Sequence, residues 1–185
     1  MRKHLVIISL LLAVTLCACS KQAQATYDKQ ETTIESLVEN ILKTDEAATV
    51  DYPGGVVRIR FSASSSTEAD PALQEGGKVT FWYGGYTVTS TSLSNSNLFA
   101  TNLQELASQS GWKNVDESMF QSETVTVGNG ELVPGLEKGL VGVKKGDEYL
   151  IVFSGKYGWG NHPRGTIPAR SALAYHIWVT DISND

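Results

Sequence analysis

The most strongly apolar segment of the chain lies at its N-terminus. Arg2 and Lys3 precede an apolar run that begins at Leu5 and continues, with few polar interruptions, to Leu16. Such a run is too short to cross a bilayer comfortably, and a positively charged start followed by an apolar run is typical of a secretory signal peptide. The sequence therefore predicts that these residues direct export and take no part in the folded domain.

The end of this segment carries a more specific motif. Residues 16–19 read Leu-Cys-Ala-Cys, which resembles the lipobox of bacterial lipoproteins. By that resemblance, residues 1–18 are a lipoprotein signal peptide, and Cys19 is the lipid-modified N-terminus that attaches the chain to a membrane of the cell envelope. A plain signal peptide, cut near Ala23 or Ala25, is the alternative.

Behind Cys19 the chain is small and polar. Residues 20–26 suit a flexible tether, and Ser20 directly after Cys19 favours the outer membrane, with the domain facing the periplasm. Apolar side chains then recur at helical spacing and predict one amphipathic helix: Ile34, Leu37, Val38, Ile41 and Leu42.

Thr32 and Glu35 have the spacing of a capping box at the start of this helix. Because one amphipathic helix cannot bury its apolar side alone, it must pack against something. We expect residues 19–54, the tether and the helix, to dock on the domain or act as a spacer, in preference to pairing with a second copy.

From residue 55 onward, strand patterns alternate with glycine-containing turns. Six segments have the alternation or the β-branched and aromatic content of strands: residues 56–61, 79–83, 86–91, 123–127, 148–153 and 172–182. Gly84 and Gly85 are predicted to break the second from the third. A short helix is predicted from Pro134 to Leu140, because proline is favoured in a first helical turn. No strand–helix–strand rhythm is present, so four to six antiparallel strands in an α+β domain over residues 55–185 are expected.

Charge and composition mainly exclude classes of function and of site. The chain has 15 basic and 20 acidic residues, a net charge of -5, and loss of Arg2 and Lys3 with the signal leaves 13 against 20, or -7. This balance argues against nucleic-acid binding. With two cysteines, both at the signal, and three histidines, neither a disulfide framework nor a Cys/His zinc site is expected. We therefore predict no metal and no cofactor.

The stretch from Gly128 to Gly142 carries the most specific motif of the domain. It reads Gly-Asn-Gly-Glu-Leu-Val-Pro-Gly-Leu-Glu-Lys-Gly-Leu-Val-Gly and resembles the signature of FKBP-type peptidyl-prolyl isomerases, in which a glycine-rich turn leads through two aliphatic residues into a short helix. Further stretches are similar to family motifs in the same order: residues 79–85, 97–99, 157–168 and 171–182. The resemblance implies an antiparallel, strongly curved sheet wrapped on one short helix, preceded here by an N-terminal helical extension.

The resemblance also implies the residues of an apolar substrate pocket. Its catalytic aromatic residues are Tyr83, Trp159 and Tyr175. Its substrate-binding residues are Phe99, Leu132, Val133, Leu136 and Ile167. Leu136 stands where the family commonly has Trp at the floor, and two further departures matter more: the acidic residue that usually follows the pocket Phe is Ala100, and Glu123 is the nearest match to an aromatic pocket residue.

Such a pocket implies cis-trans isomerisation of Xaa-Pro bonds in unfolded, exported proteins. An apolar aromatic pocket desolvates and twists the amide, so the reaction needs no nucleophile, base or metal. Ala100 and Glu123 leave a second function open, that of a non-catalytic chaperone or client-binding module on the same scaffold. The oligomeric state stays open at this point.

Overall fold

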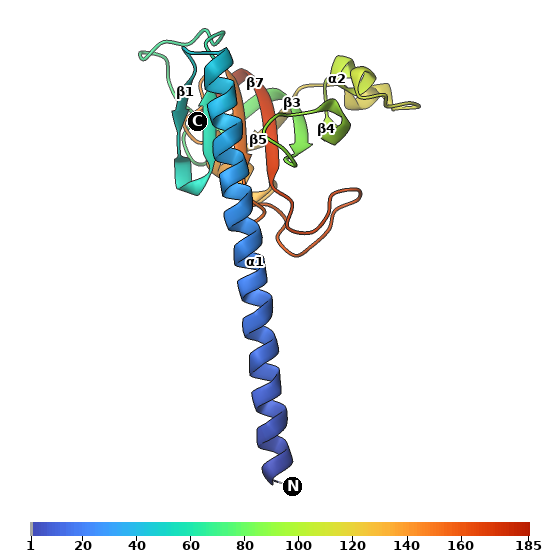
Figure 1. Ribbon diagram of the computed structural model, residues 1–185. Coiled ribbons are helices and arrows are strands. Elements are labelled where there is room, and N and C mark those ends of the chain that lie inside the picture. Colours follow the sequence, from blue (N-terminus) through green and yellow to red (C-terminus); the bar gives the residue numbers. More distant parts are fainter. Residues whose placement is uncertain (1) are drawn as a thin grey trace.

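Seven antiparallel strands form one open sheet with helices on both of its faces (Figure 1). The computed structural model describes the backbone of residues 2–185 and the side chains of residues 21–185. The helices are α1 (Arg2–Thr44), α2 (Gln104–Gln109) and α3 (Pro134–Leu140). The strands are β1 (Thr49–Asp51), β2 (Val57–Arg60), β3 (Lys78–Thr87), β4 (Leu98–Thr101), β5 (Glu123–Thr126), β6 (Glu148–Phe153) and β7 (Leu173–Ser183). The predicted α+β class and the antiparallel sheet are confirmed.

The longest strands lie side by side in the middle of the sheet. The strand order is β1-β2-β6-β7-β3-β4, and β5 also pairs with β3. β7 occupies one edge of β3 along its whole length, so β4 and β5 follow one another along the other edge. Because successive side chains point to opposite faces of a strand, the central strands β3, β6 and β7 contribute to two separate cores.

The inner core lies between the sheet and α3. Leu136 and Leu140 of α3 are buried against Ile151 and Phe153 of β6. Gly135 and Gly139 lie on the side of α3 that faces β6, and a Cβ atom at either position would overlap the Phe153 ring or Ile151. The helix therefore packs with its backbone directly on the strand, and the prediction of a helix from Pro134 to Leu140 is confirmed.

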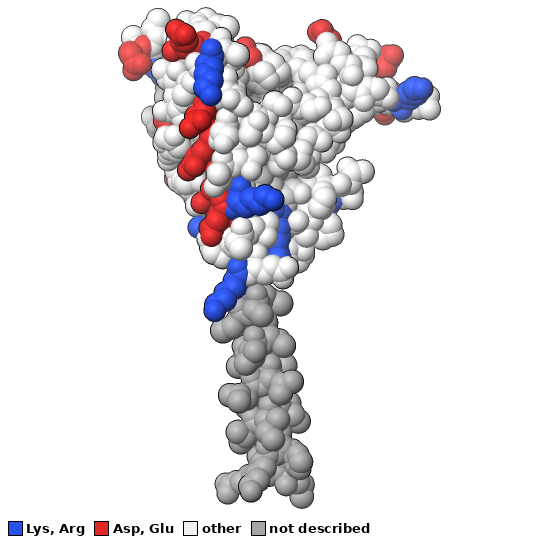
Figure 2. Space-filling model, viewed as in Figure 1, with Lys and Arg blue, Asp and Glu red and all other residues white. Residues whose placement is uncertain are grey.

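The outer core lies between the opposite face of the sheet and α1. Leu37 and its apolar neighbours on α1 are buried against Leu150 and Val152, the residues of β6 that point away from α3. Acidic and basic side chains are interspersed along the exposed side of the same helix (Figure 2). The helix thus docks on the domain, which was one of the two roles expected for it.

The start of α1 differs from the prediction. Thr32 was expected to cap the helix, yet its hydroxyl donates to the Asp28 carbonyl oxygen one turn earlier (3.2 Å). Residues 20–26, expected as a flexible tether, also lie within α1. Threonine within a helix commonly bonds back to the carbonyl four residues earlier. The capping-box spacing of Thr32 and Glu35 therefore does not mark the start of the helix.

The predicted break at Gly84 and Gly85 is also wrong, because β3 passes through both residues. A Cβ atom at Gly85 would lie 2.9 Å from the Phe99 ring, and one at Gly84 would lie 2.9 Å from the Leu106 side chain. These glycines permit close approach on the two faces of a continuous strand. The sheet has seven strands, not four to six: β1 has only three residues and β4 (Leu-Phe-Ala-Thr) has no alternation of apolar and polar residues, so neither is predicted from the sequence.

The N-terminal predictions concern residues whose side chains lie outside the described part of the structure. Cys19, the proposed lipidation site, is among them, as are the side chains of residues 1–18. Among the described residues, no helix has the length and apolar character that crossing a membrane requires.

Candidate active site

An apolar cavity of about 290 Å³ opens on the inner face of the sheet. Its wall is built from β3, β4, β5, β7, the start of α3 and the loop between β6 and β7. The lining residues are Phe81, Tyr83, Phe99, Ala100, Glu123, Glu131, Leu132, Val133, Leu136, Trp159 and Tyr175. Residues separated by almost one hundred positions in the sequence therefore meet at one site.

Aromatic rings form most of the wall and support one another. The Phe99 ring lies edge-on to Trp159 and to Tyr175, with a ring-centre distance of 5.8 Å in each pair. The Tyr175 ring stacks on Phe153 of the inner core at 6.1 Å and lies 6.3 Å from Tyr83. Edge-to-face and stacked pairs at these distances are favourable, so the wall is held by ring contacts that continue into the core.

The start of α3 forms the floor. Val133 is the N-cap residue, Pro134 opens the first turn, and Leu136 is 3% exposed below the cavity. The Gly135 N–H donates to the Tyr157 carbonyl oxygen (2.8 Å). This bond ties the helix start to the loop that carries Trp159, and it fixes the floor relative to one wall.

Asn102 fills the gap between β4 and β5 along the edge of β3. Its side-chain oxygen accepts from the Tyr83 N–H (2.7 Å). Its amide donates to the Phe81 carbonyl (3.2 Å) and to the Gln121 carbonyl (3.0 Å). Asn102 is 4% exposed, so it satisfies backbone groups that no strand partner reaches and fixes the backbone of Tyr83 and of the segment that leads into Glu123.

The Trp159 loop is fastened at its base by α1. The Gln30 side chain accepts from the Gly155 N–H (2.9 Å) and donates to the Arg170 carbonyl oxygen (2.5 Å). Gly155 and Arg170 are the two ends of this loop. One side chain of the N-terminal helix therefore holds together the loop that supplies a cavity wall.

The electrostatics of the cavity depend on Glu123. Partial burial raises the pKa of the Glu123 carboxyl above its usual value. Burial, and to a smaller extent the charge of Glu123, raises the pKa of the Tyr83 hydroxyl. Burial also raises the pKa of Tyr175, to which Tyr83 and Glu123 add. Both phenols are therefore neutral donors at physiological pH, in a site that disfavours charge.

Comparison with known proteins identifies the family. The sequence profile of the family "FKBP-type peptidyl-prolyl cis-trans isomerase" matches residues 69–180, a segment that contains every residue lining the cavity. The chain belongs to this family. The apolar cavity described above, called the FKBP cavity from here on, is thus the site that the sequence motifs predicted.

Individual relatives match shorter parts of the chain or share the fold alone. Peptidyl-prolyl cis-trans isomerase FKBP9 of Homo sapiens and that of Mus musculus are each 38% identical over 58 residues, 31% of this chain and 10% of the relative. The three FKBP domains of wheat FKBP73 align with a TM-score of 0.56 at 17% identity, covering 75% of this chain and 52% of that one. FkpA from Escherichia coli aligns with a TM-score of 0.51 at 18% identity, covering 95% and 71%.

Seven of the eight predicted pocket residues line the FKBP cavity: Tyr83, Phe99, Leu132, Val133, Leu136, Trp159 and Tyr175. Ile167 does not. Its side chain is buried in the inner core, and its N–H donates to the Arg164 carbonyl oxygen (2.8 Å). A short turn in the loop therefore uses the backbone N–H of Ile167, and its side chain is not available to the cavity.

Three residues of the site were missed by the sequence analysis. Phe81 and Glu131 line the cavity, and Asn102 supports it from the strand edge. Phe81 precedes the pocket Tyr by two residues and therefore shares its face of β3, a signal that strand alternation offers. Asn102 gives no such signal, because its role depends on a gap between two strands.

The histidines lie outside the FKBP cavity. His176 is on β7, where its Nε2 lies 2.6 Å from a Glu148 carboxylate oxygen and its ring stacks on Trp178. Among residues with described side chains, no three His, Cys, Asp or Glu residues form a group that would hold a metal ion. Neither His162 nor His176 is thus part of the candidate site.

Proposed function

We propose that this protein is a peptidyl-prolyl cis-trans isomerase that assists the folding of exported proteins. The observation that carries the proposal is the cavity itself, in which Tyr83, Phe99, Trp159 and Tyr175 surround a floor made by Leu136. Its volume and apolar lining suit a proline ring, and membership of the family supports the same reaction.

The barrier to isomerisation arises from amide resonance. Twisting a peptide bond costs about 18–20 kcal/mol because it destroys the conjugation of nitrogen and carbonyl. Water stabilises the planar, polar form more than the twisted one. An apolar wall removes that water, and interactions that favour the twisted amide over the planar one lower the barrier.

The residues of the cavity have distinct roles in this mechanism. Phe99 and Trp159 form the apolar wall against which the proline ring packs, and Leu136 closes the floor. The Tyr83 hydroxyl, neutral at physiological pH, donates a hydrogen bond to the substrate. No step requires transfer of a proton to or from the enzyme, which agrees with a cavity that lacks histidine.

The N-terminal sequence adds a location to the proposal. The motif at residues 16–19 supports a lipid anchor on Cys19, and Ser20 supports the outer membrane with the domain in the periplasm. Cleavage there would leave a chain held firmly at the envelope, because each buried CH₂ of the acyl chains contributes about 0.8 kcal/mol. Incorporation of labelled palmitate that is lost in Cys19→Ser is the test.

A second candidate is a client-binding chaperone without catalysis. Ala100 and Glu123 favour it, because the wall lacks an acidic residue at one position and gains a carboxylate in place of an aromatic ring at the other. Suppression of aggregation of a proline-free client that survives loss of the pocket aromatic residues would support this function.

A proline-limited refolding assay decides between the two. We expect catalysis by the wild-type protein and a fall in kcat/KM of at least about tenfold in Trp159→Ala, because a wall of the cavity is lost. Tyr83→Phe should reduce kcat/KM by about two- to tenfold, the value of one hydrogen bond to substrate. Tyr52→Phe, which removes an exposed hydroxyl outside the cavity, is the matched control. Wild-type activity no higher than that of the Tyr83→Phe/Trp159→Ala double variant would exclude the isomerase.

A further inference from the structure

Two carboxylates stand in the wall of an otherwise apolar cavity. Glu123 and Glu131 both line it, and no lysine or arginine does. An apolar pocket is sufficient to hold a proline ring, so these charges have no evident part in that contact. They are therefore free to act on the residues beside the proline.

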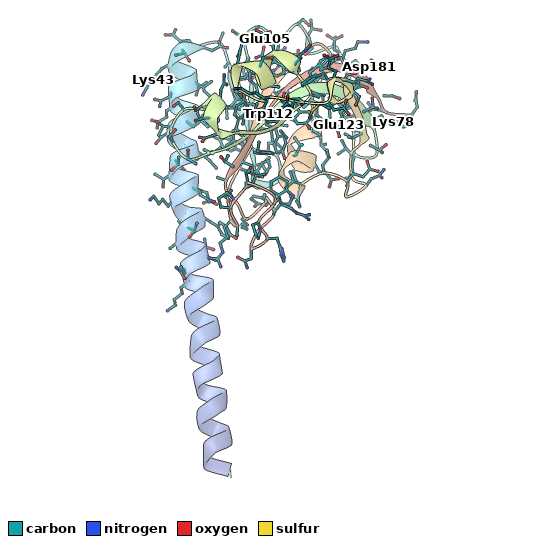
Figure 3. All side chains as sticks on the ribbon, turned by 90° about the vertical axis from the view of Figure 1, so that its right-hand side faces the viewer. Lys43, Lys78, Glu105, Trp112, Glu123 and Asp181 are labelled. Atoms are coloured by element: carbon teal, nitrogen blue, oxygen red, sulfur yellow. The ribbon has the colours of Figure 1, made fainter. Side chains whose placement is uncertain are left out.

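The strand register brings Glu123 to the cavity side of the sheet. Glu123 on β5 pairs with Phe81 on β3, and directly paired residues project to the same face. Phe81 is buried on the inner face and lines the cavity. In Figure 3, Glu123 lies on the side of the domain away from α1, as an inner-face position requires.

Neither carboxylate is neutralised by a neighbour. The ion pairs among the described side chains involve Asp51, Asp147, Asp181 and Glu148, but not Glu123 or Glu131. The groups that line the cavity beside Glu123 are Tyr83 of β3 and Tyr175 of β7, both of which are neutral phenols. The cavity therefore carries negative charge that no neighbouring cation compensates. We call Glu123 and Glu131 together the rim of the cavity.

We propose that this rim selects substrates with a lysine or arginine adjacent to the proline. The inference rests on the proposed function and names its substrate class. The proline ring enters the apolar cavity, and the long cationic side chain next to it reaches Glu123 or Glu131. A peptide with an acidic residue at the same place is repelled.

The expected preference is moderate because the carboxylates are accessible to solvent. An exposed ion pair changes the affinity by a factor that ranges from less than two to about five. Two carboxylates together should favour lysine over a neutral side chain of the same length by about three- to tenfold. Salt should reduce this preference, since the Debye length falls from about 30 Å at 0.01 M to about 3 Å at 1 M.

The experiment uses peptides that differ only beside the proline. Lysine, norleucine or glutamate is placed directly before the proline in one set and directly after it in the other. Exchange between the cis and trans forms is measured by NMR, which avoids the specificity of a coupling protease, and each Kd is obtained by titration. The assay runs at about pH 8, where carboxyl groups are ionised.

The variant that removes the rim charge is Glu123→Gln/Glu131→Gln. The matched control is Glu35→Gln/Glu39→Gln, which removes the same charge from exposed positions of α1 on the opposite side of the sheet. We expect the preference for lysine over norleucine to fall to about onefold in the rim variant and to persist in the control. If the double variant does not fold, Glu123→Gln and Glu131→Gln are measured singly.

Each outcome bears on one claim. Equal kcat/KM and Kd for lysine and norleucine in both peptide sets overturns the inference. A preference that survives in the rim variant as it does in the control also overturns it, because net charge then explains the effect. Absence of catalysis with every peptide overturns the proposed isomerase instead, and the Kd ratio still decides whether the rim selects a basic residue.

Discussion

Asp147 is a buried charge whose hydrogen bonds determine its protonation. Its side chain is 0% exposed and accepts from Arg60 Nε (2.6 Å), from the Ser66 N–H (2.8 Å) and from the Tyr149 hydroxyl (2.9 Å). Burial alone would raise the pKa of this carboxyl, but these donors outweigh it and lower the pKa to about 2. The residue stabilises the turn that leads into β6.

The protein should lose this contribution in acid. A carboxyl whose pKa is lower in the folded than in the unfolded protein stabilises the fold above its unfolded pKa, about 3.9, and ceases to do so as pH falls through the folded value. Asp147→Asn should lower the free energy of unfolding by about 2–4 kcal/mol at pH 7, because it leaves Arg60 without its charge partner. The difference from wild type should shrink as pH falls from about 5 to about 2.

Urea unfolding of both proteins across that pH range measures this effect. Asp116→Asn is a suitable control, since the Asp116 carboxylate is exposed and accepts a single local bond from the Ser118 N–H. A wild-type advantage over Asp147→Asn that stays constant down to pH 2 would contradict the assignment.

At the residue scale, the sequence predicted the aromatic wall but not its supports. Tyr83, Trp159 and Tyr175 lie within local motifs, so their shared site could be inferred without coordinates. The part played by Asn102 depends on where β4 ends and β5 begins along one edge of β3. Such a position is a property of the paired strands, which no local pattern encodes.

At the scale of elements, α1 and the Trp159 loop are linked through one side chain. Gln30 bonds to Gly155 and Arg170 at the two ends of the loop. The loop has little regular structure of its own between these points. Its conformation therefore depends on this connection and on the ring contact between Trp159 and Phe99.

Gln30→Ala should loosen the Trp159 loop. We expect kcat/KM for a proline peptide to fall by about three- to tenfold, together with a loss of about 1–2 kcal/mol in the free energy of unfolding, because two bonds to backbone groups are removed. Hydrogen exchange should become faster at the amides of Gly158 and His162, whose N–H groups bond within the loop. General destabilisation would instead raise exchange throughout the domain.

Gln24→Ala is the matched control for this substitution. Gln24 is exposed on the same helix, and its amide donates to the Asp28 carboxylate one turn later (2.7 Å). Gln30→Ala with unchanged kcat/KM and unchanged loop exchange would show that the helix does not position Trp159.

The sequence predicted the existence of elements better than their limits. The run of apolar residues from Ile34 to Leu42 correctly indicated a docked amphipathic helix, because burial of that face requires helical spacing. The start of α1 was misplaced, since polar residues before Thr32 continue a helix as readily as they end one. Gly84 and Gly85 were misinterpreted for a related reason: glycine marks both turns and close contacts.

At the scale of the whole molecule, one sheet supports two cores. Phe153 and Tyr175 belong to the inner core, whereas Leu150 and Val152 belong to the outer core. Because both sets alternate along the same strands, damage to either core should be felt by the other. The segment between β4 and β5 adds to the outer core, because Leu106 and Trp112 pack there. Trp112 is labelled in Figure 3, as is Glu123 of the inner face.

Leu37→Ala should therefore destabilise the entire domain. Leu37 is 2% exposed between α1 and the sheet, and removing its side chain should cost about 2–5 kcal/mol through lost burial and the cavity left behind. We expect thermal unfolding followed by tyrosine and tryptophan fluorescence and by far-UV circular dichroism to shift together. Glu35→Ala, on the exposed side of the helix, is the control. If α1 unfolded at a lower temperature while the FKBP cavity stayed intact, the claim that the two cores depend on one another through the sheet would be wrong.

The position of Gln30 on α1 has a consequence for proteolysis of the helix. Lys21 is exposed and precedes Gln30, while Lys43 is exposed near the end of the helix, after the residues of α1 that pack in the outer core. A cut after Lys21 would leave a domain that keeps Gln30, which holds the ends of the Trp159 loop, and both cores. A cut after Lys43 would separate the domain from Gln30 and from the residues of α1 that pack in the outer core, so the position of a cut along one helix decides whether the domain keeps both supports.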